Sequence, residues 1–136
     1  MTVRILIADD DASIRTLLRR LLEEHMDWQV CGEASNGYDA VTQAAQLVPD
    51  VVVIDLAMPQ MNGLQTAREI FTRSPTLPML LLTVQEVSTE LAREATRAGF
   101  QGAVSKNTGA EVILGIETLL RKEKFFRYSP FDMSAD

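Results

Sequence analysis

Short apolar runs alternate along this chain with longer segments of helical periodicity, and this alternation constrains the fold more than any other feature. The clearest run is VVVI at residues 51–54, a continuous β-branched stretch typical of a parallel strand covered on both faces. Further apolar runs occupy residues 4–8, 29–34, 79–82 and 101–105. Apolar residues at helical spacing follow each run, as at Ile14, Leu18 and Leu22. The alternation predicts five consecutive βα units.

Five βα units in a chain of 136 residues predict one domain of the α/β class. Right-handed connections between parallel strands place helices on both faces of an open sheet, which makes a doubly wound, three-layer αβα structure. A closed eight-stranded barrel would need about twice this length. Chain breakers such as Asn36-Gly37, Pro49 and Asn62-Gly63 stand where the units meet.

Composition and charge exclude several functions. The net charge of -6 and the pI near 4.8 disfavour a surface for nucleic acid or for an anionic membrane, because such surfaces need clustered Lys and Arg. The single cysteine, Cys31, excludes an internal disulfide and a multi-cysteine zinc site. The sequence contains no stretch of about 18 apolar residues that would predict a membrane span or a long signal segment. We therefore expect a cytoplasmic protein.

Polar residues end four of the predicted strands. They are Asp9-Asp10-Asp11, Asp55, Thr83 and Ser105-Lys106. Taken singly, each has an ordinary structural explanation as a helix cap or a solvated end, and capping is the preferred explanation for Asp11. The carboxyl ends of parallel strands share one edge of a sheet, however, and ligands bind there. We therefore expect these side chains to converge on one site.

The convergence predicts a metal-assisted phosphate site. Clustered carboxylates repel one another unless a cation neutralises them, and Mg²⁺ suits a site of carboxylates, water and phosphate oxygens. Mn²⁺ is the alternative ion. Asp55 is the expected nucleophile, because it ends the most apolar strand and Asp9 and Asp10 are better placed to hold the ion. Lys106 and Thr83 are expected to contact phosphoryl oxygens.

These residues lie in segments that resemble the receiver domain of two-component response regulators. Residues 5–10, ILIADD, resemble the acidic pair of that family, and residues 53–63, VIDLAMPQMNG, resemble its phosphoacceptor loop. Residues 32–37, GEASNG, and the Lys106-Asn107 pair resemble the NarL/LuxR-type branch. The match runs over about residues 3–122. It predicts a receiver domain at residues 1–122, followed at 123–136 by a C-terminal tail or a truncated linker.

The resemblance implies a CheY-like, flavodoxin-like sheet of order 2-1-3-4-5. It implies that Asp10, Asp55 and the Ala57 carbonyl hold Mg²⁺, with Asp9 reaching the ion through water. It also implies that a sensor histidine kinase donates the phosphoryl group from its own phosphohistidine to Asp55. The phosphorylated domain would then switch a partner-binding or dimerisation surface, with a homodimer as one outcome, to regulate transcription through an output domain.

Three departures from the family pattern concern the switch and the lifetime of the acyl phosphate. Ala103 stands where receivers usually carry Tyr or Phe, so the usual partner of Thr83 in the switch is missing. Val84 replaces a smaller residue and is expected to narrow the site. Ala57 and Gln85 occupy the two positions that tune hydrolysis. Slow loss of phosphate is the expected result.

Other functions are less favoured. An aspartate-nucleophile phosphatase usually carries Asp two residues after its nucleophile, where this chain has Ala57. Nucleotide binding is disfavoured because neither glycine-rich phosphate motif occurs. A degenerate interaction domain is disfavoured because all five expected site residues are present. We expect no enzymatic activity beyond accepting and slowly losing phosphate. The aromatic residues after 122 are expected to pack back on the domain as a final helix turn.

Overall fold

A computed structural model of the chain describes residues 2–107 and 109–126. In chain order, the elements are β1 (Val3–Ala8), α1 (Ala12–Glu23), β2 (Trp28–Ala34), α2 (Gly37–Leu47), β3 (Val51–Asp55), α3 (Gly63–Arg73), β4 (Met79–Thr83), α4 (Thr89–Ala98), β5 (Gly102–Ser105), α5 (Gly109–Leu120) and β6 (Phe125–Phe126). The first ten elements alternate strictly between strand and helix, as the sequence predicts.

The strands form one parallel sheet of order β2-β1-β3-β4-β5-β6. The predicted order 2-1-3-4-5 is confirmed, and the described residues add a sixth, two-residue strand at the β5 edge. β3 and β4 are buried along their whole lengths, which fits their position in the middle of the sheet. Register places Asp55 beside Leu82 and Thr83 beside Ser105, so the polar strand ends lie at one edge.

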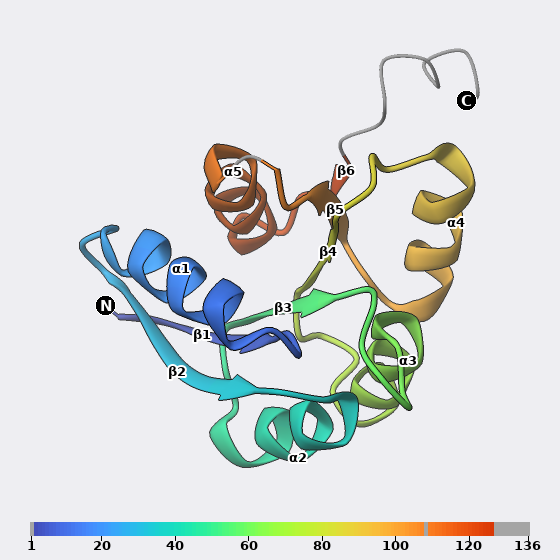
Figure 1. The fold of residues 1–136 in the computed structure, drawn as a ribbon, viewed down its shortest axis with the longest axis horizontal. Helices are drawn as coiled ribbons and strands as arrows, with labels where there is room; N and C mark the ends of the chain where they lie inside the picture. Colours follow the sequence, from blue (N-terminus) through green and yellow to red (C-terminus); the bar gives the residue numbers. More distant parts are fainter. Residues whose placement is uncertain (1, 108, 127–136) are drawn as a thin grey trace.

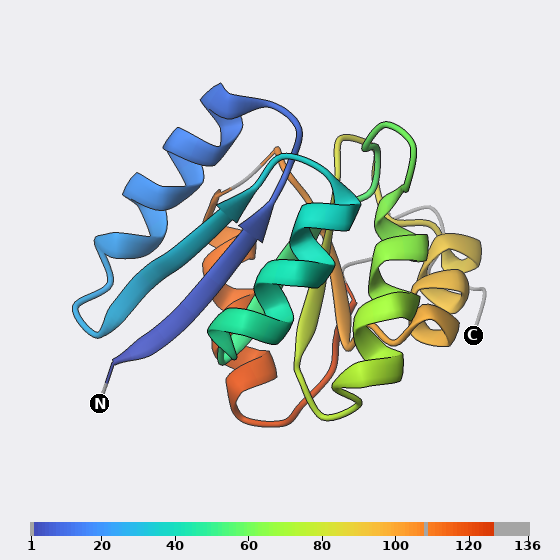
Figure 2. The ribbon, with the colours of Figure 1, turned by 90° about the horizontal axis from the view of Figure 1, so that it is seen from below.

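Helices cover both faces of the sheet (Figure 1). On one face, α1 and α5 pack on a core that includes Leu22, Ile116 and Leu119. On the other face, α2, α3 and α4 pack through small and branched residues such as Ala40, Ala67 and Ala95. Figure 2 shows α2 and α3 side by side across this second face. The three-layer αβα prediction is confirmed.

Capping residues fix where α1 and α3 begin. Asp11 caps α1 by accepting hydrogen bonds from the backbone N–H groups of Ser13 and Ile14, which confirms its predicted role. Asn62 and Gln65 form a reciprocal capping box at the start of α3. These caps set the starts of the helices that follow β1 and β3, next to the residues of the candidate site.

The segment after α5 differs from its prediction. Phe125 and Phe126 form β6 and pair with Gly102 and Ala103, whereas the sequence predicted a final helix turn in this part of the 123–136 tail. The aromatics do pack back on the domain, but as a strand. Tyr128, Pro130 and Phe131 lie outside the described residues. None of the helices described in residues 2–107 and 109–126 has the length and apolar character of a membrane span.

Candidate functional site

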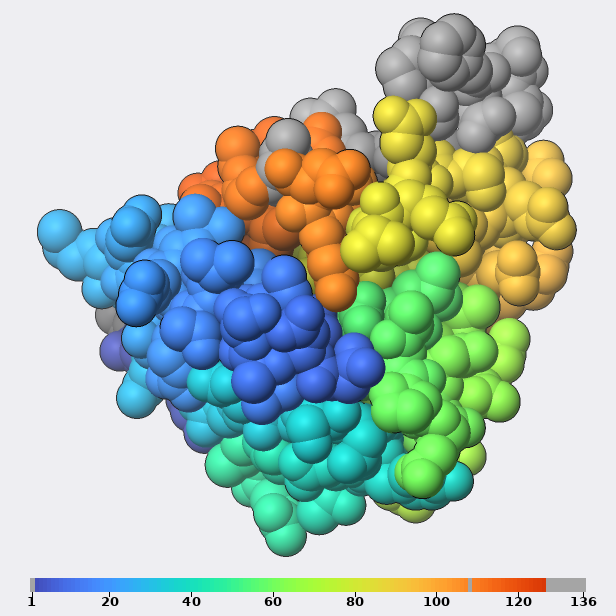
Figure 3. Space-filling model, viewed as in Figure 1, coloured from blue at the N-terminus to red at the C-terminus, as the bar shows by residue number. Residues whose placement is uncertain are grey.

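The loops that follow β1, β3, β4 and β5 meet in the middle of one face of the molecule (Figure 3). A cavity of about 290 Å³ opens between them. Its lining consists of Asp9, Asp10, Asp11, Asp55, Leu56, Ala57, Thr83, Val84, Gln85 and Lys106. Of the nine predicted site residues, eight line this cavity. The ninth, Ala103, is buried in the core beside α4.

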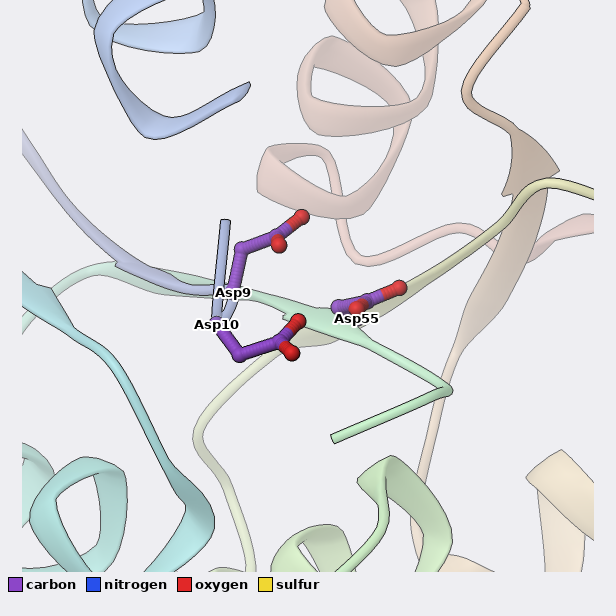
Figure 4. A group of neighbouring side chains, drawn as sticks. All are labelled: Asp9, Asp10 and Asp55. Carbon is purple, nitrogen blue, oxygen red and sulfur yellow. The ribbon is translucent and has the colours of Figure 1, made fainter. Parts of the chain in front are cut away.

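Three carboxylates form the acidic part of the site. Oxygens of Asp9, Asp10 and Asp55 lie within 4.8 Å of one another. Asp9 and Asp10 come from the end of β1 and Asp55 from the end of β3, as Figure 4 shows. Asp9 and Asp55 are buried, whereas Asp10 is exposed. The negative charges of these three carboxylates repel one another unless positive charge balances them.

Lys106 supplies positive charge at this point. Its Nζ lies 2.7 Å from Asp9 Oδ2 and 3.0 Å from Asp55 Oδ1. Burial alone would lower the pKa of Lys106, but its hydrogen bonds to Asp9 and Asp55 outweigh burial and raise that pKa above the usual value. Burial, assisted by the charge of Asp9, raises the pKa of Asp55 despite the ammonium beside it. Lys106 therefore remains a cation between two carboxylates.

Gly63 permits the close packing that places Asp55. The backbone N–H of Gly63 donates to the Leu56 carbonyl at 2.9 Å, so α3 begins directly against the end of β3. A Cβ atom at residue 63 would lie 2.4 Å from the Asp55 carbonyl oxygen, a distance that no side chain tolerates. The glycine in the NG pair at 62–63 therefore matters because only a residue without a side chain can approach Asp55 this closely.

In addition to its ion pair with Lys106, Asp9 accepts hydrogen bonds from Asp11 and Arg15. Its carboxylate accepts from the backbone N–H of Asp11 at 2.9 Å, and its backbone carbonyl accepts from Arg15 Nη1 at 2.7 Å. Arg15 also pairs with Glu33 of β2 at 3.1 Å. Sequence reasoning missed Arg15 and Glu33. The approach of α1 to β2 brings them together, and periodicity alone does not reveal such a pair.

Thr83, Val84 and Gln85 form the side of the cavity at the end of β4. Thr83 is buried, and its hydroxyl accepts from the backbone N–H of Gln85 at 3.1 Å. Val84 is 66% exposed, so it lies at the rim of the cavity. The structure thus places Val84 where a substrate or water would enter.

Lys106 is aligned by its backbone as well as by its side chain. Its N–H donates to the Thr83 carbonyl at 2.8 Å, which continues the pairing of β5 with β4. No cis peptide bond occurs in the described part of the chain, so the Lys106-Asn107 bond is trans, the form that a bond not followed by proline strongly favours. His25 lies beyond the far end of α1, where its ring stacks on Trp28 with centroids 3.9 Å apart.

The donor set fits a hard divalent cation. It offers carboxylate oxygens from three residues, two of them on adjacent positions of one loop, and the cavity beside them leaves room for water. Mg²⁺ is bound in proteins by one or two carboxylates together with water and phosphate oxygens. The predicted ligand Ala57 also lines this cavity.

Sequence comparison identifies the family. The profile of the response regulator receiver domain matches residues 5–117. The chain belongs to the response regulator receiver family. Receiver domains of this family act as phosphoacceptors and bind Mg²⁺ at an acidic pocket. The predicted family, fold and receiver function are confirmed.

This receiver domain is similar in sequence to proteins of more than one kind. It is 43% identical, over 76% of its length, to a protein-glutamate methylesterase/protein-glutamine glutaminase of Alkalilimnicola ehrlichii, of which it covers 26%. It is 33% identical, over 92% of its length, to the uncharacterized transcriptional regulatory protein YxjL of Bacillus subtilis, of which it covers 57%. The chain therefore spans between about a quarter and just over half of these curated relatives.

A solved structure supports the resemblance to the NarL/LuxR-type branch. The two-component response regulator of the LuxR family from Aurantimonas sp. SI85-9A1 superposes with a TM-score of 0.89 at 30% identity. The superposition covers 98% of this chain and 94% of that chain. The fold of the receiver domain is thus shared over nearly its whole length.

Proposed function

We propose that Asp55 accepts the phosphoryl group in this receiver domain and that the phosphohistidine of a sensor histidine kinase donates it. The proposal rests on the position of the Asp55 carboxylate. It borders an open cavity and shares the Lys106 ammonium with Asp9. Of the three clustered carboxylates, Asp55 alone ends the central strand β3 and is buried beside both Lys106 and Thr83.

Transfer forms one bond and breaks one bond. A carboxylate oxygen of Asp55 attacks the phosphorus atom of a phosphohistidine whose other ring nitrogen carries a proton. The phosphorus–nitrogen bond breaks with its electron pair going to the released nitrogen, so no further proton is needed to give a neutral imidazole. The product is an acyl phosphate on Asp55 and a neutral histidine on the kinase. Catalysis of this transfer requires mainly positioning and charge neutralisation.

The remaining residues of the cavity supply these two needs. Lys106 would keep its positive charge and pair with a phosphoryl oxygen, because its pKa is raised. Thr83 would donate a hydrogen bond from its hydroxyl to a second phosphoryl oxygen, which its position in the cavity lining supports. Ala57, Val84 and Gln85 would set how easily water reaches the acyl phosphate.

Asp10, Asp55 and the Ala57 carbonyl are proposed to hold Mg²⁺, with Asp9 reaching it through water. When bound, the ion would neutralise charge on the phosphoryl oxygens and the clustered carboxylates. Mn²⁺ would occupy the same oxygen ligands. The proximity of the three carboxylates supports this assignment.

Residues 1–122 are proposed as the receiver unit and residues 123–136 as a C-terminal tail or a truncated linker. Phosphorylation would shift a partner-binding or dimerisation surface, and a homodimer is one proposed product. The similarity to transcriptional regulators of Bacillus subtilis supports control of transcription as the output. Light scattering before and after phosphorylation tests the homodimer directly.

Intact-mass spectrometry tests the proposed acceptor. The protein is incubated with acetyl phosphate and Mg²⁺, and a gain of one phosphoryl group is expected. Asp55→Asn should show no gain, whereas Asp11→Asn, which changes a neighbouring carboxylate that caps α1, should still be labelled. Equal labelling of wild type and Asp55→Asn would show that another residue accepts the group.

A further inference from the structure

The two edges of the described sheet differ in length. β6, at one end of the strand order, has two residues, whereas β2, at the other end, has seven. β2 runs between α1 on one face and α2 on the other, and no described strand pairs with its outer side (Figure 1). A long edge strand offers backbone N–H and C=O groups on which a strand of another molecule can pair. β2 is therefore the edge at which self-association is the greater hazard.

Two side chains of α1 bond the backbone of Val30, near the middle of β2. The Val30 N–H donates to Glu23 Oε2 at 3.0 Å, and the Val30 carbonyl accepts from Arg19 Nη1 at 3.4 Å. The same guanidinium nitrogen lies 3.5 Å from Glu23 Oε2, so the two side chains also attract each other. Hydrogen bonds with one charged partner are about twice as strong as those between neutral groups. Both polar backbone groups of Val30 are thus already bonded to α1.

A side chain of α2 bonds the backbone of β2 near its other end. Gln43 Nε2 donates one hydrogen bond to the Glu33 carbonyl at 2.8 Å and another to Asp39 Oδ2 at 2.9 Å, one turn earlier on the same helix. A Cβ atom at residue 32 would lie 2.4 Å from Gln43 Oε1, so Gly32 leaves the space that this amide occupies. The amide of Gln43 is therefore held against the backbone of β2 by its neighbours on both elements.

The carboxylate of Glu33 links the contacts along this edge. Arg19 Nε donates to Glu33 Oε2 at 2.7 Å, and Arg15 Nε donates to Glu33 Oε1 at 3.1 Å. Arg19 therefore contacts β2 twice, at the Val30 carbonyl and at the Glu33 side chain. Charged side chains along an edge strand oppose the approach of another strand, because that strand would remove water from them. Ion pairs thus cover the same stretch of β2 whose backbone groups are bonded.

An irregularity in β2 lies between these contacts. Ile5 of β1 pairs with Val30, but the next residue of β1, Leu6, pairs with Gly32, so Cys31 is an extra residue on β2. Such a bulge bends its strand and increases the local twist. A second strand would have to follow this bend in order to pair along the whole edge, which makes long pairing less favourable.

We propose that side chains of α1 and α2 close β2 to pairing with the β2 strand of a second copy of this chain. Around a two-fold axis each copy would supply the same edge, so no other partner is required. In the wild-type domain, an incoming strand would first have to break the bonds made by Arg19, Glu23 and Gln43. Without these side chains, the backbone groups of β2 would be left unpaired, and a second strand would satisfy them. A homodimer of the wild-type domain consequently uses another surface.

A triple variant of the full chain tests the closure, with Arg19→Ala, Glu23→Ala and Gln43→Ala combined. Sedimentation velocity should show its weight-average mass rising to about twice that of the wild type or more as the concentration increases. Hydrogen exchange of the Val30 amide locates the contact. In the triple variant this exchange should slow by about tenfold between dilute and associated samples, because the partner strand then accepts the N–H that Glu23 bonded.

The matched control combines Arg20→Ala, Glu24→Ala and Gln46→Ala. It removes the same three residue types from exposed positions on the same helices or at the end of α1, and its mass should equal that of the wild type. Equal masses for the wild type and the first triple variant would overturn the closure. Equal association of both triple variants, or Val30 exchange that does not depend on concentration, would overturn it as well.

Single variants decide the question if the triple variant does not fold. Trp28, the single tryptophan, is buried, so its emission reports folding. Glu23→Ala removes the acceptor of the Val30 N–H, whereas Glu23→Gln retains an oxygen that can accept it. Association of Glu23→Ala but not of Glu23→Gln supports the closure, and identical sedimentation of the two overturns it. These outcomes are independent of whether Asp55 accepts a phosphoryl group.

Discussion

The guanidinium of Arg15 holds the backbone of Asp9. Arg15 Nη1 lies 2.7 Å from the Asp9 carbonyl oxygen, and Arg15 Nε pairs with Glu33 at 3.1 Å. Arg19, one helical turn later, also pairs with Glu33, at 2.7 Å, and its second hydrogen bond goes to the Val30 carbonyl. The two arginines therefore share a partner, but Arg15 alone of the pair bonds the acidic loop.

Arg15→Gln should weaken Mg²⁺ binding by about tenfold, the lower end of the effect seen when groups that orient metal ligands are removed. The physical reason is the loss of the contact that fixes the Asp9 backbone. Arg19→Gln is the matched control and should leave Mg²⁺ affinity within about twofold. Isothermal titration calorimetry measures both. If both variants weaken Mg²⁺ binding equally, the ion pairs with Glu33 account for the effect, and the contact of Arg15 with Asp9 does not.

Asp10→Ala should abolish phosphorylation from acetyl phosphate. Asp10 is the exposed member of the acidic group, so its removal deletes a proposed Mg²⁺ ligand without opening the core. Without the ion, the remaining carboxylates repel an incoming phosphoryl donor. Intact mass after incubation with and without EDTA provides the measurement. Normal labelling of the wild type in EDTA would contradict the requirement for Mg²⁺.

The acyl phosphate on Asp55 should be long-lived in the absence of a phosphatase. Hydrolysis needs a water aligned with the acyl-phosphate bond, and Ala57 has no side-chain group that could hold it. Val84 lies at the rim, where its branched side chain narrows the approach. Ala57→Asn should therefore speed phosphate loss by about tenfold, and Val84→Ala should speed both loading and loss.

The decay of phosphorylated protein after removal of the donor measures these lifetimes. Val48→Ala serves as the control, because Val48 is also highly exposed but lies at the end of α2, outside the lining of the site. Its decay should equal that of the wild type. If the wild type decays fastest of all four proteins, the water-positioning explanation is wrong.

Stability should depend on the ionisation of Glu33 at acidic pH. Hydrogen bonding from Arg19, together with Arg15 and against the effect of burial, lowers the pKa of Glu33 below its usual value of 4.5. A lowered folded-state pKa contributes stability that is present above about pH 4.5 and is lost as the pH falls through the folded-state pKa. Partly exposed pairs of this kind contribute about 1 kcal/mol or less.

Glu33→Gln should consequently lower the free energy of unfolding at pH 7 by about 1 kcal/mol and have little effect near pH 3. Urea unfolding at both pH values measures the difference, and Glu86→Gln is a control because Glu86 is an exposed carboxylate of the β4–α4 turn. A Glu33→Gln effect that is equal at the two pH values would exclude the ion pairs as its cause.

The local sequence determined the elements and most of the candidate site. Continuous β-branched and apolar runs predict β3 and β4 because such runs suit strands buried on both faces. Alternation of strand and helix then brings the strand ends to one edge, so Asp10, Asp55, Thr83 and Lys106 were predictable neighbours. The cap at Asp11 and the trans peptide bond before Asn107 could also be read from the sequence, because each depends only on neighbouring residues.

Tertiary structure alone decided the contacts between distant segments. Lys106 reaches Asp9 across 97 positions, and Arg15 meets Glu33 only where α1 packs on β2. Phe125 and Phe126 show no strand periodicity, and they form β6 because Gly102 and Gly115 leave space for them. Periodicity reports which face of an element is buried, whereas the partner on that face depends on how separate elements pack, which no local pattern encodes.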